Sequence, residues 1–217
     1  MKSVISSITI LGIVALCFAC EAQKKKNQSV REIELSAPDG KSIAAFAEGC
    51  FWCSEHIFEA VVGVDSAVSG YAGGTVPNPT YELVNTETTG HAETVLVYYD
   101  PKLTSYAELA TVFFTSHDPT TPNQQGPDRG SSYRSILFYL TPEEKTMADQ
   151  AFKDFSTSGL YKRPLVTEIK KLTAFYRAEE YHQNYIEHNP ETPYVQGVSL
   201  PRFELFKKTY DGRLKAN

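Results

Sequence analysis

Residues 47–55, Ala-Glu-Gly-Cys-Phe-Trp-Cys-Ser-Glu, constrain this chain more than any other stretch. They hold two of its four cysteines, Cys50 and Cys53, with two aromatic residues between them. An apolar run, 42–47, leads into the pair and a helical pattern follows it, which predicts Cys50 at a strand-to-helix junction behind Gly49. A helix N-terminus and Cys-x-x-Cys spacing both lower a thiol pKa from its usual value of about 8.5. The sequence therefore predicts Cys50 as a thiolate nucleophile and Cys53 as its partner.

The N-terminus predicts export. A basic start at Lys2 precedes an apolar run that is too short for a comfortable membrane span and is typical of a secretory signal. The run ends Cys17-Phe18-Ala19-Cys20, which resembles a bacterial lipoprotein signal whose Cys20 becomes the lipidated first residue. Ordinary cleavage and retention as an uncleaved anchor are the alternatives. Each of the three takes the domain out of the cytoplasm, and we expect a membrane-anchored lipoprotein that faces the periplasm.

The remaining length bounds the organisation of the chain. Its 217 residues suffice for one sizeable domain but not for two. We expect a signal peptide at 1–20, a polar tether at 21–40 and one domain at 41–217. The net charge of −5 gives no electrostatic footprint for nucleic acid.

Because Cys17 and Cys20 lie in the predicted signal segment, the domain contains a single cysteine pair. This pair could be a structural disulfide, a redox centre or a metal site. A disulfide that closes so short a loop removes little entropy from the unfolded chain, because that gain grows with loop length. The spacing therefore favours a redox-active or metal-binding pair.

The order of elements predicts the fold class. The sequence predicts strands over 42–47, 64–71, 93–99, 134–140 and 165–172, and helices over 51–62, 105–114 and from 142 onward. Long loops separate them at 72–90 and 116–132, and a polar-aromatic cluster at 176–185 is followed by irregular segments. The order matches a ferredoxin-like β-α-β-β-α-β core. We therefore expect an α+β, two-layer sandwich with an extra helix and strand and long loops.

A family resemblance becomes specific at Gly49-Cys50-Phe51-Trp52, a signature of peptide methionine sulfoxide reductases of the A type (MsrA). Further matching blocks follow in the order of the family. They are Ser-Gly-Tyr-Ala-Gly-Gly at 69–74, Asn-Pro-Thr-Tyr at 78–81, Thr-Gly-His-Ala-Glu at 89–93, His-Asp-Pro-Thr at 117–120, Asp-Arg-Gly-Ser-Ser-Tyr-Arg-Ser at 128–135 and Ala-Glu-Glu-Tyr-His-Gln-Asn-Tyr at 178–185. The resemblance covers roughly residues 44–196.

The resemblance implies a role for each site residue. Cys50 attacks the sulfur of methionine sulfoxide, and Glu93 protonates the oxygen with hydrogen bonds from Tyr81 and Tyr133. A carboxyl that donates a proton must be neutral near pH 7, so the pKa of Glu93 must rise from about 4.3, as desolvation by aromatic rings would make it do. The expected binding residues are Phe51 and Trp52, which hold the methyl group, with Asp128 and His182. A turn cap at Asp128 and a purely structural hydrogen bond at His182 are the alternatives.

The resemblance also implies how the enzyme is recycled. Turnover leaves a sulfenic acid on Cys50, and Cys53 is the resolving cysteine because the domain has no other thiol. An external thiol reductant, thioredoxin or a thioredoxin-like protein, then reduces the Cys50–Cys53 disulfide. We expect repair of methionine-S-sulfoxide in oxidised proteins and peptides, and of free methionine sulfoxide, by a monomer with no bound cofactor or metal.

Two rival interpretations remain at this stage. An exported Cys-x-x-Cys also occurs in thioredoxin-like disulfide oxidoreductases, although the bulky Phe-Trp pair and the order of elements disagree with that fold. A metal-binding lipoprotein could use Cys50, Cys53 and His56, but a structural zinc site normally takes four ligands.

Overall fold

The structure, a computed structural model, describes residues 30–216. The predicted signal peptide, the lipidation site at Cys20 and residues 21–29 of the predicted tether lie outside the described residues. Within 30–216, no helix is both long and apolar enough to cross a membrane.

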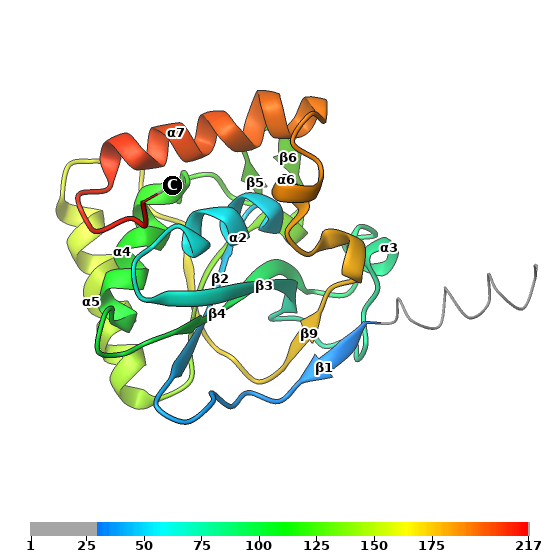
Figure 1. The fold of residues 1–217 in the computed structure, drawn as a ribbon, viewed down its shortest axis with the longest axis horizontal. Helices are drawn as coiled ribbons and strands as arrows, with labels where there is room; N and C mark the ends of the chain where they lie inside the picture. Colours follow the sequence, from blue (N-terminus) through cyan, green and yellow to red (C-terminus); the bar gives the residue numbers. More distant parts are fainter. Residues whose placement is uncertain (1–29, 217) are drawn as a thin grey trace, which may run out of the picture.

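The described chain forms one seven-stranded sheet, a two-stranded ribbon and a set of helices (Figure 1). The strands are β1 (Arg31–Ile33), β2 (Ser42–Glu48), β3 (Val64–Ala72), β4 (Ala92–Tyr99), β5 (Gln124–Gln125), β6 (Asp128–Arg129), β7 (Ser135–Tyr139), β8 (Glu168–Lys171) and β9 (Phe175–Arg177). The α-helices are α2 (Phe51–Glu59), α3 (Tyr81–Val84), α4 (Tyr106–Ser116), α5 (Pro142–Thr157), α6 (Tyr185–His188) and α7 (Leu200–Thr209). Two 3₁₀ turns, η1 (Ser131–Tyr133) and η2 (Glu180–His182), and a π-helical turn, η3 (Val195–Ser199), complete the list.

The sheet has the strand order β1-β9-β3-β4-β2-β7-β8. Its centre, β3-β4-β2-β7, is antiparallel throughout, with β2 paired to both β4 and β7. This is the arrangement of a ferredoxin-like β-α-β-β-α-β core, in which two non-consecutive strands lie side by side at the centre. The predicted α+β sandwich is confirmed, and β8, parallel to β7, is the predicted extra strand.

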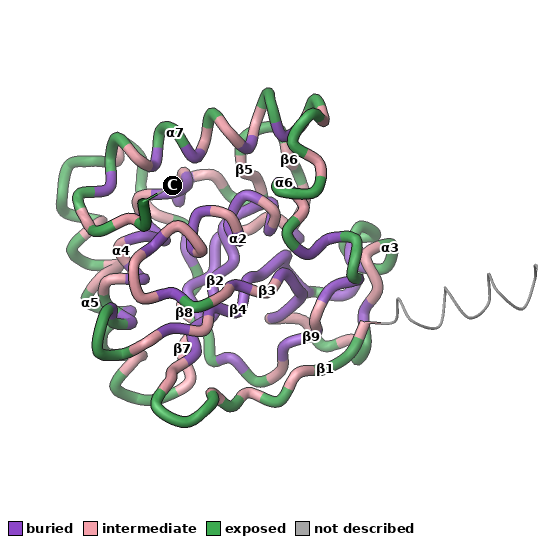
Figure 2. Tube along the Cα trace, viewed as in Figure 1, coloured by how far each residue is buried: buried purple, intermediate pink, exposed green. Residues whose placement is uncertain are grey.

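The central strands β2, β4 and β7 are buried along most of their length, so they are apolar at most positions rather than alternating, whereas β3 carries polar residues at Asp65, Ser66 and Ser69 (Figure 2). In β2, Ala44 and Phe46 face helices α2, α4, α5 and α7, and the Phe46 ring stacks on Phe58 of α2 at 4.6 Å. The opposite side chains, among them Ile43 and Ala45, pack in a second cluster with Leu35 and Ala37 of the extended segment between β1 and β2 and with Leu172, which follows β8. One layer of helices and one layer of extended segments therefore enclose the sheet.

The two ends of the domain differ from the prediction. Arg31–Ile33 pairs with β9 as an edge strand. Leu35 and Ala37 pack in the cluster on the sheet face opposite the helices, so this part of the predicted tether belongs to the domain. At the other end, the tail expected to be irregular contains α7, which contacts both α2 and α4 and lies across the top of the view in Figure 1. Because α7 packs on α2, the C-terminal part of the chain reaches the cysteine pair.

Candidate active site

Cys50 lies where β2 ends and α2 begins, as the sequence predicts. It is the N-cap of α2, and its carbonyl accepts hydrogen bonds from the N–H groups of Cys53 and Ser54. Gly49 precedes it with a φ of +94°, and a Cβ there would lie 2.5 Å from Cβ of Gln125. Glycine is therefore needed for both the left-handed backbone and the close approach of the loop that carries Gln125.

Glu93 lies beside this junction, on the buried β4 strand. One of its carboxyl oxygens accepts the backbone N–H of Phe51 at 3.0 Å. The side chain is enclosed, and burial raises the pKa of Glu93 to about 8 despite that hydrogen bond, with a further rise from the charges of Asp128 and Cys53. A neutral carboxyl near pH 7 is thus available next to Cys50, which is the state that proton donation requires.

The two tyrosines predicted to assist Glu93 come from separate loops and meet in space. Tyr81 begins α3 inside the predicted loop 72–90, and its hydroxyl lies close to Tyr133 and to the side chain of Asn85. Burial, followed by the nearby Glu93, raises the pKa of Tyr133. Both phenols therefore stay protonated and can donate hydrogen bonds to an oxygen placed against Glu93.

Phe51 and Trp52 form an aromatic wall whose orientation is fixed from the C-terminal side. The Trp52 ring stacks on Tyr185 of α6 at 3.6 Å, and its indole N–H donates to Nδ1 of His182 at 3.1 Å. The Phe51 ring lies 5.0 Å from the His182 ring. His182 is neutral, because burial lowers its pKa to about 4. His182 therefore contacts both rings of the aromatic wall.

Asp128, on β6, is joined to the site through a tyrosine that the sequence analysis missed. The Tyr194 hydroxyl donates to Oδ2 of Asp128 at 2.5 Å and lies near the Cys50 thiol, where it opposes the rise of the Cys50 pKa. The Tyr194 ring meets the Trp52 ring edge-on at 5.7 Å. Tyr194 thus links the nucleophile, the aromatic wall and Asp128. No local motif marks Tyr194, and its place in the site follows only from contacts with residues far from it in the sequence.

The two thiols are free, buried and close enough together that the ionisation of one affects the other. Burial, then the hydrogen bond with Cys53, raises the pKa of the Cys50 thiol. The hydrogen bond from Cys50, together with Arg202 and Ser199, lowers the pKa of Cys53 to about 6. The prediction of a lowered pKa at Cys50 is therefore wrong, because burial and the neighbouring Cys53 thiol both raise it.

A cavity of about 690 Å³ reaches this side of the pair. Its lining includes Cys53, Tyr194, Asp128 and Arg202, whereas Cys50 and Glu93 are not part of it. The cavity therefore meets the cysteine pair at Cys53, with Tyr194 and Asp128 in its wall.

The structure disagrees with both rival interpretations. The His56 ring packs edge-on against Phe203 at 4.5 Å, and no group of three metal-ligating side chains exists among residues 30–216. The sheet order is ferredoxin-like.

Comparison with known proteins defines the class. A family model described as "Peptide methionine sulfoxide reductase" matches residues 42–214. Peptide methionine sulfoxide reductase MsrA 1 of Rhodopirellula baltica is 42% identical over 185 residues, covering 85% of this chain and 95% of the relative. The chain is thus an oxidoreductase of the methionine sulfoxide reductase class. It belongs to the peptide methionine sulfoxide reductase A family.

Solved structures agree with the assignment. Methionine sulfoxide reductase A of Corynebacterium diphtheriae has a TM-score of 0.67 at 33% identity, covering 71% of this chain and 78% of that one. Mxr1 of Saccharomyces cerevisiae in its reduced form has a TM-score of 0.66 at 31% identity, covering 75% and 91%. The yeast protein has also been solved in complex with Trx2, where the match, at 23% identity and a TM-score of 0.50, shows a likeness of fold.

Proposed function

We propose that this chain reduces methionine-S-sulfoxide through a sulfenic acid on Cys50 and a disulfide between Cys50 and Cys53. The observation that carries the proposal is the buried, neutral Glu93, hydrogen-bonded to the Phe51 N–H directly beside Cys50. A proton donor next to a thiol and an aromatic wall is what reduction of a sulfoxide needs.

In the first step, the methionine methyl group packs against Phe51 and Trp52, and the sulfoxide oxygen lies between Glu93 and the hydroxyls of Tyr81 and Tyr133. The sulfur–oxygen bond of the substrate breaks and one between oxygen and the Cys50 sulfur forms, so two electrons pass to the methionine sulfur. Glu93 gives a proton to the oxygen and regains the one that Cys50 loses. Methionine leaves, and Cys50 remains as a sulfenic acid.

In the second step, Cys53 attacks the Cys50 sulfur, a disulfide forms and the oxygen leaves as water. A dithiol protein then attacks the disulfide, and exchange returns both cysteines to thiols. Thioredoxin or a thioredoxin-like protein is the proposed reductant, as the yeast relative solved with Trx2 suggests. The cavity that ends at Cys53 offers such a reductant a way to the disulfide.

The experiment is reduction of two epimeric peptides, one with methionine-S-sulfoxide and one with the R form, by the purified protein and dithiothreitol. We expect methionine from the S peptide only, a preference that the resemblance to the family implies and that a chiral site around Cys50 can enforce. Chromatographic separation of the oxidised and reduced peptides measures the conversion of each epimer. Equal conversion of both epimers would contradict the proposed specificity, and conversion of neither would contradict the proposed function.

We also propose that the protein is an exported lipoprotein with Cys20 as its lipidated first residue. The support is the apolar run that ends Cys17-Phe18-Ala19-Cys20. Mass spectrometry of the mature protein should find its N-terminus at Cys20 with a diacylglyceryl group. An unmodified N-terminus elsewhere would contradict the proposal.

A further inference from the structure

The start of α7 places two polar side chains against Cys53. The Sγ atom of Cys53 and Oγ of Ser199 are hydrogen-bonded at 3.2 Å, although 146 positions separate them in the chain. Arg202 follows Ser199 by three residues, so both side chains lie on one face of the helical segment. When Cys53 is a thiolate, only the Ser199 hydroxyl can donate in this bond, so the contact favours the charged form of Cys53.

Arg202 is held in place by two fixed partners. Its Nη2 donates to Oε1 of Glu48 at 2.7 Å, and its Nε donates to the carbonyl of Ser116 at 2.8 Å. Its Nη1 lies 3.8 Å from where a Cβ of Gly49 would be, which puts it at the entrance to the Cys50–Cys53 segment. The guanidinium also lines the cavity that reaches Cys53. Arg202 is thus a rigid cation beside the thiol rather than a mobile surface charge.

The other titratable groups that face Cys53 are anionic or neutral. They are Cys50 on its own segment, Glu93 on β4, Glu48 on β2, Asp128 on β6 and Tyr194 before η3. Arg202 is the one cation in this set of described residues. Stabilisation of a thiolate at Cys53 by opposite charge therefore depends on Arg202.

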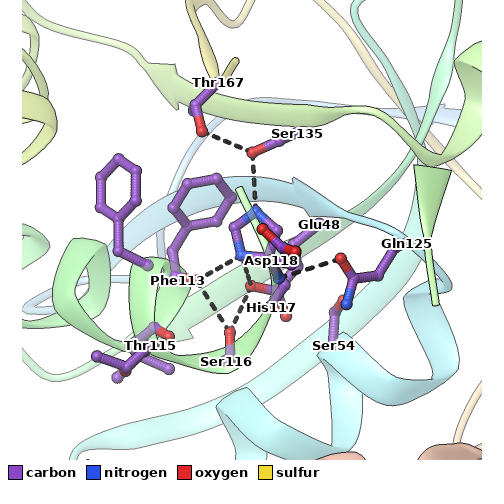
Figure 3. A network of polar contacts seen from close by, with 12 residues as sticks. Glu48, Ser54, Phe113, Thr115, Ser116, His117, Asp118, Gln125, Ser135 and Thr167 are labelled. Carbon is purple, nitrogen blue, oxygen red and sulfur yellow. Dashed lines mark hydrogen bonds and ion pairs between the residues drawn. The ribbon is translucent and has the colours of Figure 1, made fainter. Parts of the chain in front are cut away.

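Glu48 opposes that effect, because it binds the same guanidinium. Its second carboxyl oxygen accepts the Ser116 hydroxyl at 2.6 Å (Figure 3). His117 lies 3.7 Å away but supplies no charge, since burial lowers its pKa to about 3 while its ring bonds to the Phe113 carbonyl and to Ser135. Burial raises the pKa of Glu48 to about 7, although Arg202 and Ser116 oppose the rise. When Glu48 is ionised, Arg202 is the cation that compensates it, and its carboxylate then competes with Cys53 for that charge.

We propose that Arg202, together with Ser199, holds Cys53 as the thiolate that attacks oxidised Cys50, and that Glu48 limits how much of the Arg202 charge acts on Cys53. This inference rests on the proposed role of Cys53 as the resolving cysteine. In the step concerned, the Cys53 thiolate supplies an electron pair to the Cys50 sulfur, the S–S bond forms, the S–O bond breaks, and the hydroxide takes a proton from neutral Glu93. Arg202, Ser199 and Glu48 are positioning residues in this step.

The test measures the ionisation of Cys53 directly. In a Cys50→Ser background Cys53 is the sole thiol of the domain, and the pH dependence of its alkylation by iodoacetamide, followed by peptide mass spectrometry, gives a midpoint. Arg202→Met should raise that midpoint by about one pH unit or more, and Arg202→Lys should restore part of the shift. Glu48→Gln should lower it, because the guanidinium is then uncompensated. A purely structural role would not produce opposite signs.

Two further variants keep the result interpretable. Arg202→Met leaves a buried carboxylate unpaired and could unfold the protein, so the double variant Glu48→Gln/Arg202→Met removes both charges, and its midpoint should also rise. Arg163→Met is the matched control: Arg163 lines the same cavity but pairs with Asp118 at its exposed edge, so the midpoint should not move. Midpoints that stay constant, or that shift in one direction for Arg202→Met and Glu48→Gln, would overturn the inference.

The kinetic consequence separates this inference from the proposed function. With both cysteines present, Arg202→Met should slow disulfide formation about tenfold or more, so that a sulfenic acid reagent traps oxidised Cys50 after one turnover. Normal disulfide formation in this variant would refute the role of Arg202 while the proposed reaction stands. A wild-type protein that makes no methionine would instead refute the proposed reaction.

Discussion

Replacing Glu93 with glutamine should lower kcat/KM for methionine sulfoxide reduction by about 10²–10⁴-fold, the range that a positioned general acid contributes. Glutamine can still accept the Phe51 N–H, so the junction between β2 and α2 should keep its geometry. It has no proton to give to the oxygen, and Tyr81 and Tyr133 can only hydrogen-bond to it. Initial rates with an S-sulfoxide peptide and dithiothreitol measure the loss, and Glu93→Asp, which keeps an acid but shortens it, is the matched control.

Comparison of the pH dependence of the wild-type and Glu93→Gln rates tests whether Glu93 is the proton donor. Because the pKa of Glu93 is about 8, the wild-type rate should fall as pH rises through that value, when the carboxyl loses its proton. The thiols titrate in both proteins, so the alkaline limb that Glu93→Gln lacks belongs to Glu93. A wild-type profile with no such limb would contradict the assignment of Glu93 as the proton donor.

The same pKa has a consequence for stability, with a definite sign. Below about pH 4.3 Glu93 is protonated in both folded and unfolded chains, and its burial carries no ionisation cost. Between there and about pH 8 the unfolded chain releases the proton while the folded one keeps it, so stability falls as pH rises. Glu93→Gln should therefore be more stable than wild type at pH 8, by up to about 5 kcal/mol, and equal to it near pH 4.

The sequence predicted the parts of the fold whose patterns are local. The central strands and the helices α2, α4 and α5 have continuous apolar runs or capped amphipathic segments, as at Thr141, where a complete capping box opens α5. The helix α7 was missed because only Phe203 and Phe206 within it are buried, too sparse a pattern to see without α2 and α4 beside it. The edge strand β1 was missed for a related reason, since backbone pairing with β9 holds it while its side chains stay largely exposed.

The same difference between local patterns and long-range contacts applies to the residues of the site. The resemblance supplied Cys50, Glu93, Tyr81 and Tyr133 as a set, and the structure brings them together from four separate elements. Residues that act through another side chain have no motif of their own. Tyr194, Ser199 and Arg202 are defined by contacts with Cys50, Asp128, Cys53 and Glu48 that span tens to more than a hundred positions. The location of the charge within the thiol pair depended on them, so local spacing assigned the lowered pKa to the wrong cysteine.

Replacing Cys53 with serine should leave an enzyme that makes about one methionine per molecule and then stops when thioredoxin is the reductant. The first turnover needs Cys50 and Glu93, both still present, but the sulfenic acid has no partner to form a disulfide that thioredoxin can recognise. Ser199 would then hydrogen-bond to a hydroxyl, which cannot resolve Cys50. Rapid-quench measurement of methionine against time, with a substrate excess, should show a burst and no steady state.

The choice of reductant and a second variant make this result specific. Dithiothreitol is small enough to react with the sulfenic acid itself, so Cys53→Ser should turn over with dithiothreitol but not with thioredoxin. Cys50→Ser should give no burst with either reductant, which separates loss of the nucleophile from loss of the resolving thiol. Sustained turnover of Cys53→Ser with thioredoxin would mean that the reductant attacks oxidised Cys50 directly. In that case the cavity that ends at Cys53 would have no part in recycling, and the charge that Arg202 places there would need another explanation.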